Sequence, residues 1–247
     1  TDADIRHCPN LWRALVTKAL TEQREMVSLM ALLDTEGMWA RLLIPAFVYF
    51  FHFMYPFEKV RDSQSKTSAA AGGCVLISRR ALDKIGGIAG HRNAMIDDLA
   101  LARRIKQACL PLSLSLTKSV VSIRPYRRLS DVWNMVARSA FTQLRCSWLV
   151  LIGTVLGMLI LFIAPMAGIC AFIGQIVSPA TPILSLVALS LMAWTYIPTI
   201  RFFRLGLSRA LTLPLAGTLY MAMTVSSAMN HFSGRYNWRG ARGRATQ

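Results

Sequence analysis

Three long apolar segments without a charged residue limit what this chain can fold into. They occupy residues 148–173, 182–200 and 210–229 of the 247. Each is close to the roughly 17–25 residues that a helix needs to cross the hydrocarbon core of a bilayer. Three such segments in succession are not typical of the buried helices of a soluble protein, so the sequence predicts a membrane α-helical region at residues 148–247.

The composition agrees with a membrane protein. Hydrophobic residues make up 54% and charged residues 16% of the chain, whereas soluble domains carry about 25% charged residues. The net charge is +16, yet all 12 acidic residues lie at or before Asp131 and nine arginines follow it. Chemistry that needs a carboxylate must therefore lie in the first part. Because the later arginines flank apolar segments, we expect a membrane partner and no nucleic acid.

The loops between the apolar segments predict their orientation. Residues 174–181 carry no charge and should be non-cytoplasmic, while residues 201–209 carry three arginines and should be cytoplasmic, like the basic first 147 residues. Three spans would place the tail at residues 235–244 outside, although it holds four arginines. Either the third segment is re-entrant or the tail departs from the positive-inside rule. The prolines Pro165 and Pro214 predict kinks within the first and third segments.

The first part of the chain alternates between strand-like and helix-like segments, which indicates an α/β domain. Strands are expected at residues 25–33 and 113–123, and residues 69–77 should form a small-residue loop that runs into a strand. Helices are expected at residues 11–18, 78–85 and 96–107.

Two segments should contact the membrane surface. Residues 131–147 have apolar residues near helical spacing and predict an amphipathic interfacial helix on which Arg138 and Arg145, seven residues apart, share one face. Residues 42–57 are rich in aromatic residues but hold two prolines and a histidine. They are more typical of an interfacial or re-entrant segment than of a full span.

Asp2-Ala3-Asp4 is a candidate metal site. Two carboxylates at positions i and i+2 at the end of a strand can serve one Mg²⁺ or Mn²⁺ ion, which in turn bridges a diphosphate. Asp-x-Asp is a common pattern, and the alternative interpretation is a polar turn.

Asp97-Asp98 is a candidate for general base chemistry. Adjacent like charges raise the pKa of one carboxylate toward the range in which it can accept a proton. The pair also stands at the start of a predicted helix, so simple capping of that helix is the alternative.

Two further groups could contact a substrate. Gly72 and Gly73 end a small-residue loop at residues 69–73, where glycine allows close approach to the backbone; a tight turn before a strand is the alternative. Arg138, Gln143 and Arg145 could neutralise a leaving diphosphate or bind anionic lipid headgroups.

The chain resembles the membrane-integrated family 2 glycosyltransferases, which include ceramide glucosyltransferase, and it resembles the bacterial hopene-associated members most closely. The resemblance covers essentially the whole chain. Its specific residues are TDADI at 1–5, RLLIPAFVYFFHFMYPF at 41–57, AAAGGCVLISRRAL at 69–82, IDDLALARRIK at 96–106, RPY at 124–126 and MVARSAFTQLR at 135–145.

The resemblance implies an inverting, metal-dependent transferase with a GT-A fold. Asp2 and Asp4 would hold Mg²⁺ or Mn²⁺ with the diphosphate of a UDP-sugar, and Asp98, beside Asp97, would be the catalytic base. The acceptor would be a hopanoid or a related polyisoprenoid lipid. The family's Gln-x-x-Arg-Trp string is absent, and Arg138, Gln143 and Arg145 are the nearest residues to it.

The resemblance also implies a domain organisation and a location. Residues 1–130 would be the C-terminal half of a GT-A catalytic region, because the family's nucleotide-binding half precedes the Asp-x-Asp motif. Residues 131–147 would be the interfacial helix and residues 148–247 the membrane helices. We expect a multi-pass protein of the bacterial inner (plasma) membrane with its catalytic region cytoplasmic. The alternative function is a non-catalytic membrane scaffold or an anionic-lipid-binding subunit.

Overall fold

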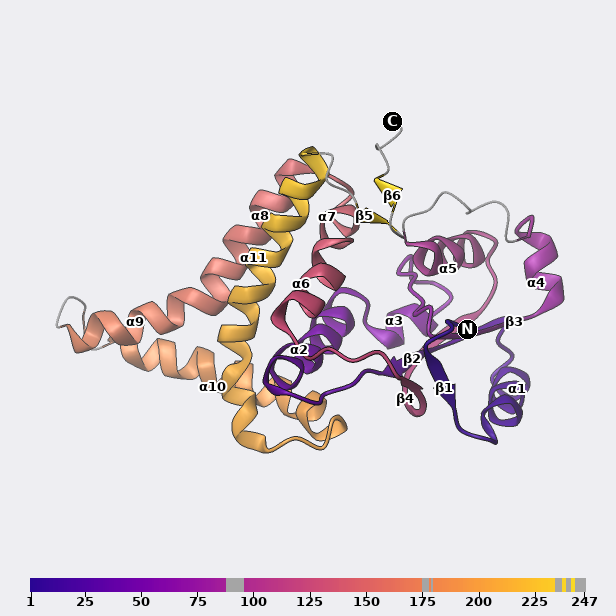
Figure 1. Ribbon diagram of the computed structural model, residues 1–247, viewed down its shortest axis with the longest axis horizontal. Coiled ribbons are helices and arrows are strands. Elements are labelled where there is room, and N and C mark those ends of the chain that lie inside the picture. The colour runs from indigo at the N-terminus through magenta and orange to yellow at the C-terminus, as the bar shows by residue number, and fades with distance from the viewer. Residues whose placement is uncertain (88–95, 175–177, 179, 234–236, 239–240, 243–247) are drawn as a thin grey trace. The chain divides into compact units, whose positions relative to one another are not determined.

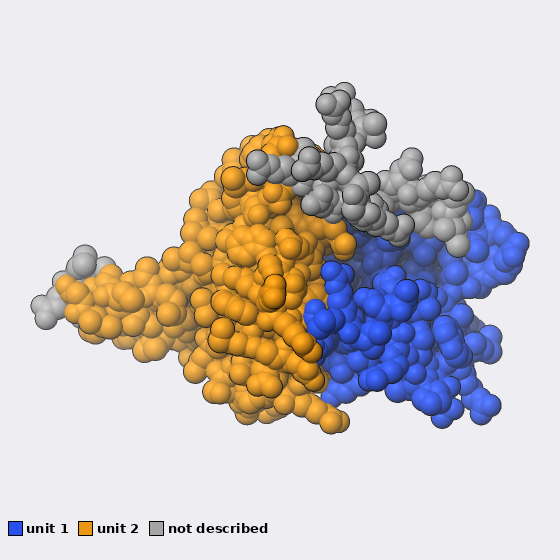
Figure 2. All heavy atoms as spheres, viewed as in Figure 1, with its two compact units in different colours: residues 1–34, 50–125 blue, residues 35–49, 126–247 orange. Residues whose placement is uncertain are grey.

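The structure is a computed structural model that describes residues 1–87, 96–174, 178, 180–233, 237–238 and 241–242. The chain forms two compact units (Figure 2). Unit 1 comprises residues 1–34 and 50–125, and unit 2 comprises residues 35–49 and 126–247. The last stretch of unit 1 ends at Pro125, whereas the catalytic region was predicted to end at residue 130. The sequence did not indicate that residues 35–49 belong to unit 2.

Unit 1 is built on a four-stranded mixed sheet in the order β1-β4-β2-β3 (Figure 1). β2 and β4 are parallel, whereas β1 pairs with β4 and β3 pairs with β2 in antiparallel fashion. The strands are β1 (Ile5–His7), β2 (Met26–Leu32), β3 (Cys74–Ile77) and β4 (Leu112–Ser122). The three predicted strands are confirmed, and the short β1 was not predicted.

Helix α1 (Leu11–Thr21) covers one face of this sheet. Leu11 and Leu15 on α1 are buried against Val27 and Leu29 of β2. Because successive side chains of a strand point to opposite faces, Ser28 stands on the face of β2 away from α1. The Ser28 side chain is thereby placed next to the loop at residues 69–73.

The other helices of unit 1 follow local sequence signals. α4 (Arg79–Lys84) begins after Ser78, whose hydroxyl accepts the Ala81 N–H at 3.0 Å. It ends before Gly86 and Gly87, which have φ of +79° and +75°, a conformation that glycine adopts without strain. α3 (Phe57–Arg61) and α5 (Asp97–Gln107) complete the unit. The helices predicted at 11–18, 78–85 and 96–107 are confirmed.

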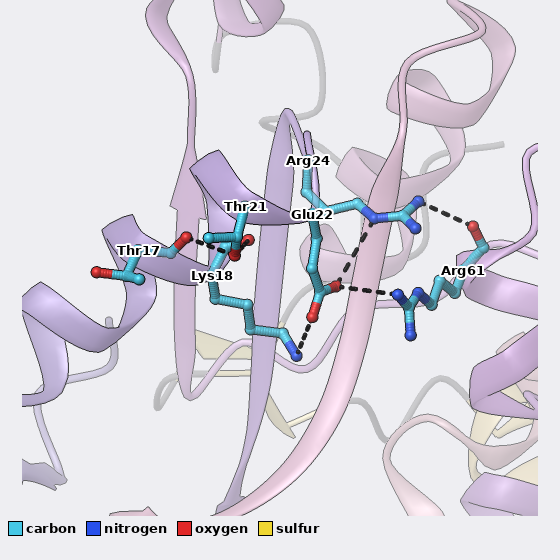
Figure 3. Close-up of polar contacts among 6 residues, drawn as sticks. All are labelled: Thr17, Lys18, Thr21, Glu22, Arg24 and Arg61. Carbon is cyan, nitrogen blue, oxygen red and sulfur yellow. Dashed lines mark hydrogen bonds and ion pairs between the residues drawn. The ribbon is translucent and has the colours of Figure 1, made fainter.

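A carboxylate surrounded by three cations joins the end of α1 to the end of α3 (Figure 3). Glu22 lies 3.1 Å from Lys18, 3.6 Å from Arg61 and 3.9 Å from Arg24. Arg24 also donates to the Arg61 carbonyl at 3.1 Å. Since ion pairs at the surface contribute about 1 kcal/mol or less each, the arrangement sets the position of α3 more than the stability of the fold.

Other cationic side chains of unit 1 donate to backbone carbonyls at the ends of secondary structure. The pairs are Lys84 Nζ with Ala108 O at 3.0 Å, Arg104 Nη1 with Ile85 O at 3.2 Å, and Lys106 Nζ with Val60 O at 2.8 Å. The hydrogen-bond acceptor of each of these three side chains is therefore a peptide carbonyl.

Unit 2 contains three helical stretches long and apolar enough to cross a membrane, at Trp148–Ile173, Ala180–Phe202 and Leu207–Phe232. Each contains a predicted span. The first consists of α8 (Trp148–Met158), a π-helical turn η2 (Leu159–Ile163) and α9 (Ala164–Ile173); the second is α10 (Ala180–Phe202); the third consists of the 3₁₀ helix η3 (Leu207–Thr212) and α11 (Leu213–Phe232).

The two prolines at which kinks were predicted, Pro165 and Pro214, stand at different places in their helical stretches. Pro165 is the second residue after the π-helical turn η2, which interrupts the α-helix where the proline N–H is missing. Pro214 stands in the first turn of α11, where no N–H is needed. The kink at Pro214 stays a prediction.

α2 (Met38–Met54) contains most of the segment predicted to be interfacial or re-entrant. It is one apolar helix of 17 residues, shorter than the three spans. Within unit 2, its Leu43 carbonyl accepts the Tyr220 hydroxyl of α11 at 3.0 Å, and Tyr49 lies 3.0 Å from the Thr195 hydroxyl of α10. Its first part therefore packs against the spanning helices.

The predicted single helix at 131–147 is wrong. The segment forms α6 (Leu129–Ala137) and a short α7 (Ala140–Gln143), separated at Arg138 and Ser139. The two helices are bonded to α11, because Ser227 accepts the Phe141 N–H at 3.0 Å and Trp133 donates to Ser226 at 3.2 Å. These contacts with α11 compete with helix continuity and break the segment in two.

The C-terminal tail contains the short antiparallel strands β5 (Asn237–Trp238) and β6 (Ala241–Arg242). The remainder of the predicted basic tail at 235–244 lies outside the described residues.

Candidate functional site

The small-residue loop at residues 69–73 is held from three directions. Ser28 of β2 bonds both polar groups of Ala71: its hydroxyl donates to the Ala71 carbonyl at 3.0 Å and accepts the Ala71 N–H at 2.8 Å. The Gly72 N–H donates to Asp98 at 2.9 Å, and the Thr1 hydroxyl donates to the Gly73 carbonyl at 2.8 Å. Consecutive residues of the loop are thus tied to three separate parts of unit 1.

The two glycines of this loop have different reasons to be glycine. A Cβ atom at Gly73 would lie 3.1 Å from the Cβ of Ala31, which is tighter than ordinary packing. A Cβ atom at Gly72 would lie 3.6 Å from a carboxylate oxygen of Asp2 and 3.6 Å from one of Asp98, which is ordinary contact. Gly73 is therefore required by packing, whereas a Cβ atom at Gly72 would fit in ordinary contact with two carboxylates.

Asp98 is the most perturbed carboxylate of unit 1. It is half-buried in the first turn of α5, and its two oxygens accept the N–H groups of Gly72 at 2.9 Å and of Leu99 at 2.7 Å. Burial raises the pKa of Asp98 to about 6, helped by the negative charges of Asp97 and Asp2 and opposed by the two N–H groups. A carboxylate with this pKa is ionised at neutral pH and is more basic than an ordinary aspartate.

The capping interpretation of Asp97-Asp98 accounts for only part of this geometry. Asp97 is exposed and accepts the Asp98 N–H at 3.0 Å, and Asp98 accepts the Leu99 N–H, so both carboxylates bond to the first turn of α5. The bond from Gly72 to Asp98 joins residues 26 positions apart, and capping does not require it.

Asp2 of the Asp-x-Asp pair lies near Asp98. Asp2 and Asp4 stand just before the strand β1. Partial burial raises the pKa of Asp2, as does repulsion from Asp4 and Asp97. The carboxylates of Asp2 and Asp98 each lie 3.6 Å from the same point beside Gly72, so they are no more than twice that distance apart.

The carboxylate oxygens of Asp2 and Asp4 have the chemistry that Mg²⁺ or Mn²⁺ prefers. Within the described ranges, no group of three or more His, Cys, Asp or Glu side chains is arranged to hold a metal ion by itself. A two-carboxylate site nevertheless fits an ion that keeps waters and also binds substrate phosphates, as Mg²⁺ commonly does.

The predicted diphosphate residues belong to unit 2. Arg138 stands at the end of α6, Gln143 ends α7, and Arg145 lies beyond α7 with φ of +55°. Because the helix is broken between them, the expectation that Arg138 and Arg145 share one helical face is wrong. The role of these three residues toward a diphosphate stays a prediction.

Two residues of this site were missed by the sequence reasoning. Thr1 holds the Gly73 carbonyl, and no local pattern marks it. Ser28 is the only polar residue of β2 (MVSLMAL) and is fully buried; a polar side chain inside an apolar strand is a signal that could have indicated it.

Comparison with known proteins identifies one family. The sequence model of glycosyl transferase family 21 matches residues 1–246. No curated protein and no solved structure matches the chain.

Proposed function

This chain belongs to glycosyl transferase family 21, a membership that implies sugar transfer to a lipid acceptor, and we propose that Asp98 is its catalytic base. The observation that carries the proposal is the position of Asp98, which is half-buried beside Gly72 and Asp2 with its pKa raised to about 6. In the proposed reaction, Asp98 removes the proton of an acceptor hydroxyl, whose oxygen attacks the anomeric carbon. The bond to the nucleotide diphosphate breaks, with inversion at that carbon.

The other predicted residues have separate proposed roles. Asp2 and Asp4 would hold Mg²⁺ or Mn²⁺, which supplies positive charge to the diphosphate of a UDP-sugar. Asp97 raises the basicity of Asp98 through its negative charge. Arg138, Gln143 and Arg145 are the proposed further contacts of the diphosphate.

The acceptor is a membrane lipid, and we propose a hopanoid or a related polyisoprenoid lipid. The support for this narrower class is the resemblance carried by residues 41–57 and 69–82. The GT-A fold is likewise proposed, with the mixed sheet of unit 1 and its adjacent carboxylates as support. The basic loops support a multi-pass protein of the bacterial inner membrane with unit 1 on the cytoplasmic side.

The alternative of a non-catalytic, lipid-binding scaffold does not require carboxylates to converge. Asp2 and Asp98, which are 96 positions apart in the chain, nevertheless lie beside the same glycine. This convergence favours catalysis over a scaffold.

The decisive experiment measures transfer by the protein expressed from its complete gene. Membranes are incubated with labelled UDP-glucose, UDP-galactose and UDP-N-acetylglucosamine, and extracted lipids are analysed by mass spectrometry. We expect a glycolipid that is absent from cells lacking the gene, and we expect Asp98→Asn to lower its formation by roughly 10²–10⁴-fold, the usual contribution of a general base. Unchanged turnover by Asp98→Asn would remove Asp98 from the role of base.

A separate titration tests the metal site. Asp4→Ala should weaken binding of UDP-sugar in the presence of Mn²⁺ and leave the weak binding without metal unchanged, as followed by calorimetry. Equal binding by the variant and the wild type in Mn²⁺ would contradict the proposed metal ligand.

A further inference from the structure

We propose that Ser28 is a positioning residue for the transfer reaction, because it orients the peptide group whose N–H is donated to Asp98. The inference rests on the proposed function in that it assumes a role for Asp98 in transfer. The geometry on which it depends, however, is a property of unit 1 alone and can be measured without a substrate.

The argument starts from the planarity of the peptide group. The carbonyl of Ala71 and the N–H of Gly72 belong to one peptide unit, which is planar and trans, so they point in opposite directions. Ser28 donates to that carbonyl at 3.0 Å, and Asp98 accepts that N–H at 2.9 Å. Fixing the carbonyl on the Ser28 side therefore fixes the direction in which the N–H points at Asp98.

Ser28 also restrains the preceding peptide group. Its hydroxyl accepts the Ala71 N–H at 2.8 Å, so one side chain holds both polar groups of Ala71. A rotation of the Ala71–Gly72 peptide away from Asp98 would break the bond to the carbonyl and leave the Ser28 hydroxyl proton without its acceptor inside the core.

The hydrogen bonds of Ser28 go to the loop at residues 69–73, so pairing of the sheet does not explain a serine at this position. The other residues of β2 are apolar, and Ser28 is fully buried. A buried hydroxyl destabilises a fold unless it is bonded, and both bonds of this hydroxyl go to Ala71. The polar residue thus serves the loop next to Asp98 and not the pairing of the sheet.

Ser113 offers a matched control. It stands on the neighbouring strand β4, paired in register with Val27, and is also buried. Its hydroxyl has no hydrogen-bond partner among the described residues. Ser28→Ala and Ser113→Ala therefore remove the same atom from adjacent places in the same sheet, and only the first removes contacts with the loop.

The test is residue-resolved hydrogen–deuterium exchange of the full chain in nanodiscs, without substrate. We expect Asp98→Ala to speed exchange of the Gly72 amide and leave the Ala71 amide protected. Ser28→Ala should speed exchange at both amides by at least tenfold, and Ser113→Ala at neither. A Gly72 amide that stays protected in Ser28→Ala would overturn the inference.

Ser28→Cys is a second variant in case the alanine variant does not fold. A thiol is a weaker donor and acceptor than a hydroxyl, so exchange at Gly72 should fall between wild type and the alanine variant. Exchange equal to wild type in a folded Ser28→Cys protein, with the alanine variant unfolded, would also overturn it.

Turnover separates the two proposals. With the UDP-sugar that forms glycolipid in the assay above, Ser28→Ala should lower kcat at least tenfold with little change in KM, whereas Ser113→Ala should change neither. If Asp98→Asn is inactive but Ser28→Ala matches Ser113→Ala, the positioning role is wrong and the base assignment stands. If Asp98→Asn is active, the base assignment is wrong.

Discussion

Replacing Asp98 by asparagine should make the protein more stable at neutral pH while it lowers transfer by roughly 10²–10⁴-fold. The carboxyl pKa of Asp98 is about 6 in the folded protein against 3.8 for an unperturbed aspartate. Between these values the folded state holds more protons than the unfolded state, so stability falls as pH rises from about 4 to about 6 and is level above that range. At about 1.4 kcal/mol for each pKa unit, the ionised Asp98 lowers stability by ~3 kcal/mol above pH 6.

The hydrogen bonds of Asp98 reduce this gain. Its two oxygens accept separate N–H groups, from Gly72 and from Leu99. Asparagine has only one oxygen, so one of these N–H groups would face an amide NH₂ at a loss of about 1–2 kcal/mol. We therefore expect a net gain of about 1–2 kcal/mol at pH 7.5 and a net loss of similar size below pH 4, where the wild-type carboxyl is protonated.

Thermal unfolding of the purified protein, followed by tryptophan fluorescence between pH 4 and pH 8, measures this crossover. A gain of about 1–2 kcal/mol corresponds to a rise of a few degrees in Tm for a chain of this size. The reasoning is refuted if the variant is less stable than wild type at pH 7.5, or if the difference between them does not change with pH.

Three further predictions follow from the same contacts. Asp97→Asn removes a like charge and lowers the pKa of Asp98, so the acidic limb of the kcat/KM profile should move to lower pH; an unmoved limb would contradict the coupling. Gly72→Ala should fold normally but lose transfer at least tenfold, because its methyl group fills the space beside the carboxylates, whereas Gly73→Ala should lower stability by about 1 kcal/mol or more through overpacking; thermal melts and the lipid assay distinguish the two. Ser227→Ala leaves a buried N–H of α7 without its acceptor and should lower stability by about 1–3 kcal/mol, and an unchanged melting temperature would show that the bond is unimportant.

Local signals in the sequence were sufficient for most elements of unit 1. The predicted strand at 25–33 and the helix at 78–85 appear as β2 and α4, because continuous apolar character and a serine cap followed by two glycines are determined by neighbouring residues. The apolar spans of unit 2 were equally clear, since a bilayer requires a fixed length of helix.

Features that depend on distant contacts could not be predicted. The break at Arg138 arises where α6 and α7 bond to α11, some 90 positions later in the chain. The bond from Gly72 to Asp98 and the two bonds of Ser28 to Ala71 need the folded sheet to bring the partners together. Residue types therefore indicated Asp2 and Asp98 as candidates, but only the fold shows that both lie beside Gly72.

The cations that donate to backbone carbonyls in unit 1 have a consequence for how a donor reaches the protein. A carbonyl has no net charge, so the hydrogen bonds of Lys84 and Arg104 hold these side chains in place without cancelling their positive charge. The electrostatic potential that they add extends over about 8 Å at physiological ionic strength and attracts a doubly charged diphosphate. Association of the nucleotide-sugar should therefore slow as salt is added, while the fold, which depends little on charge pairs at these positions, tolerates the same salt.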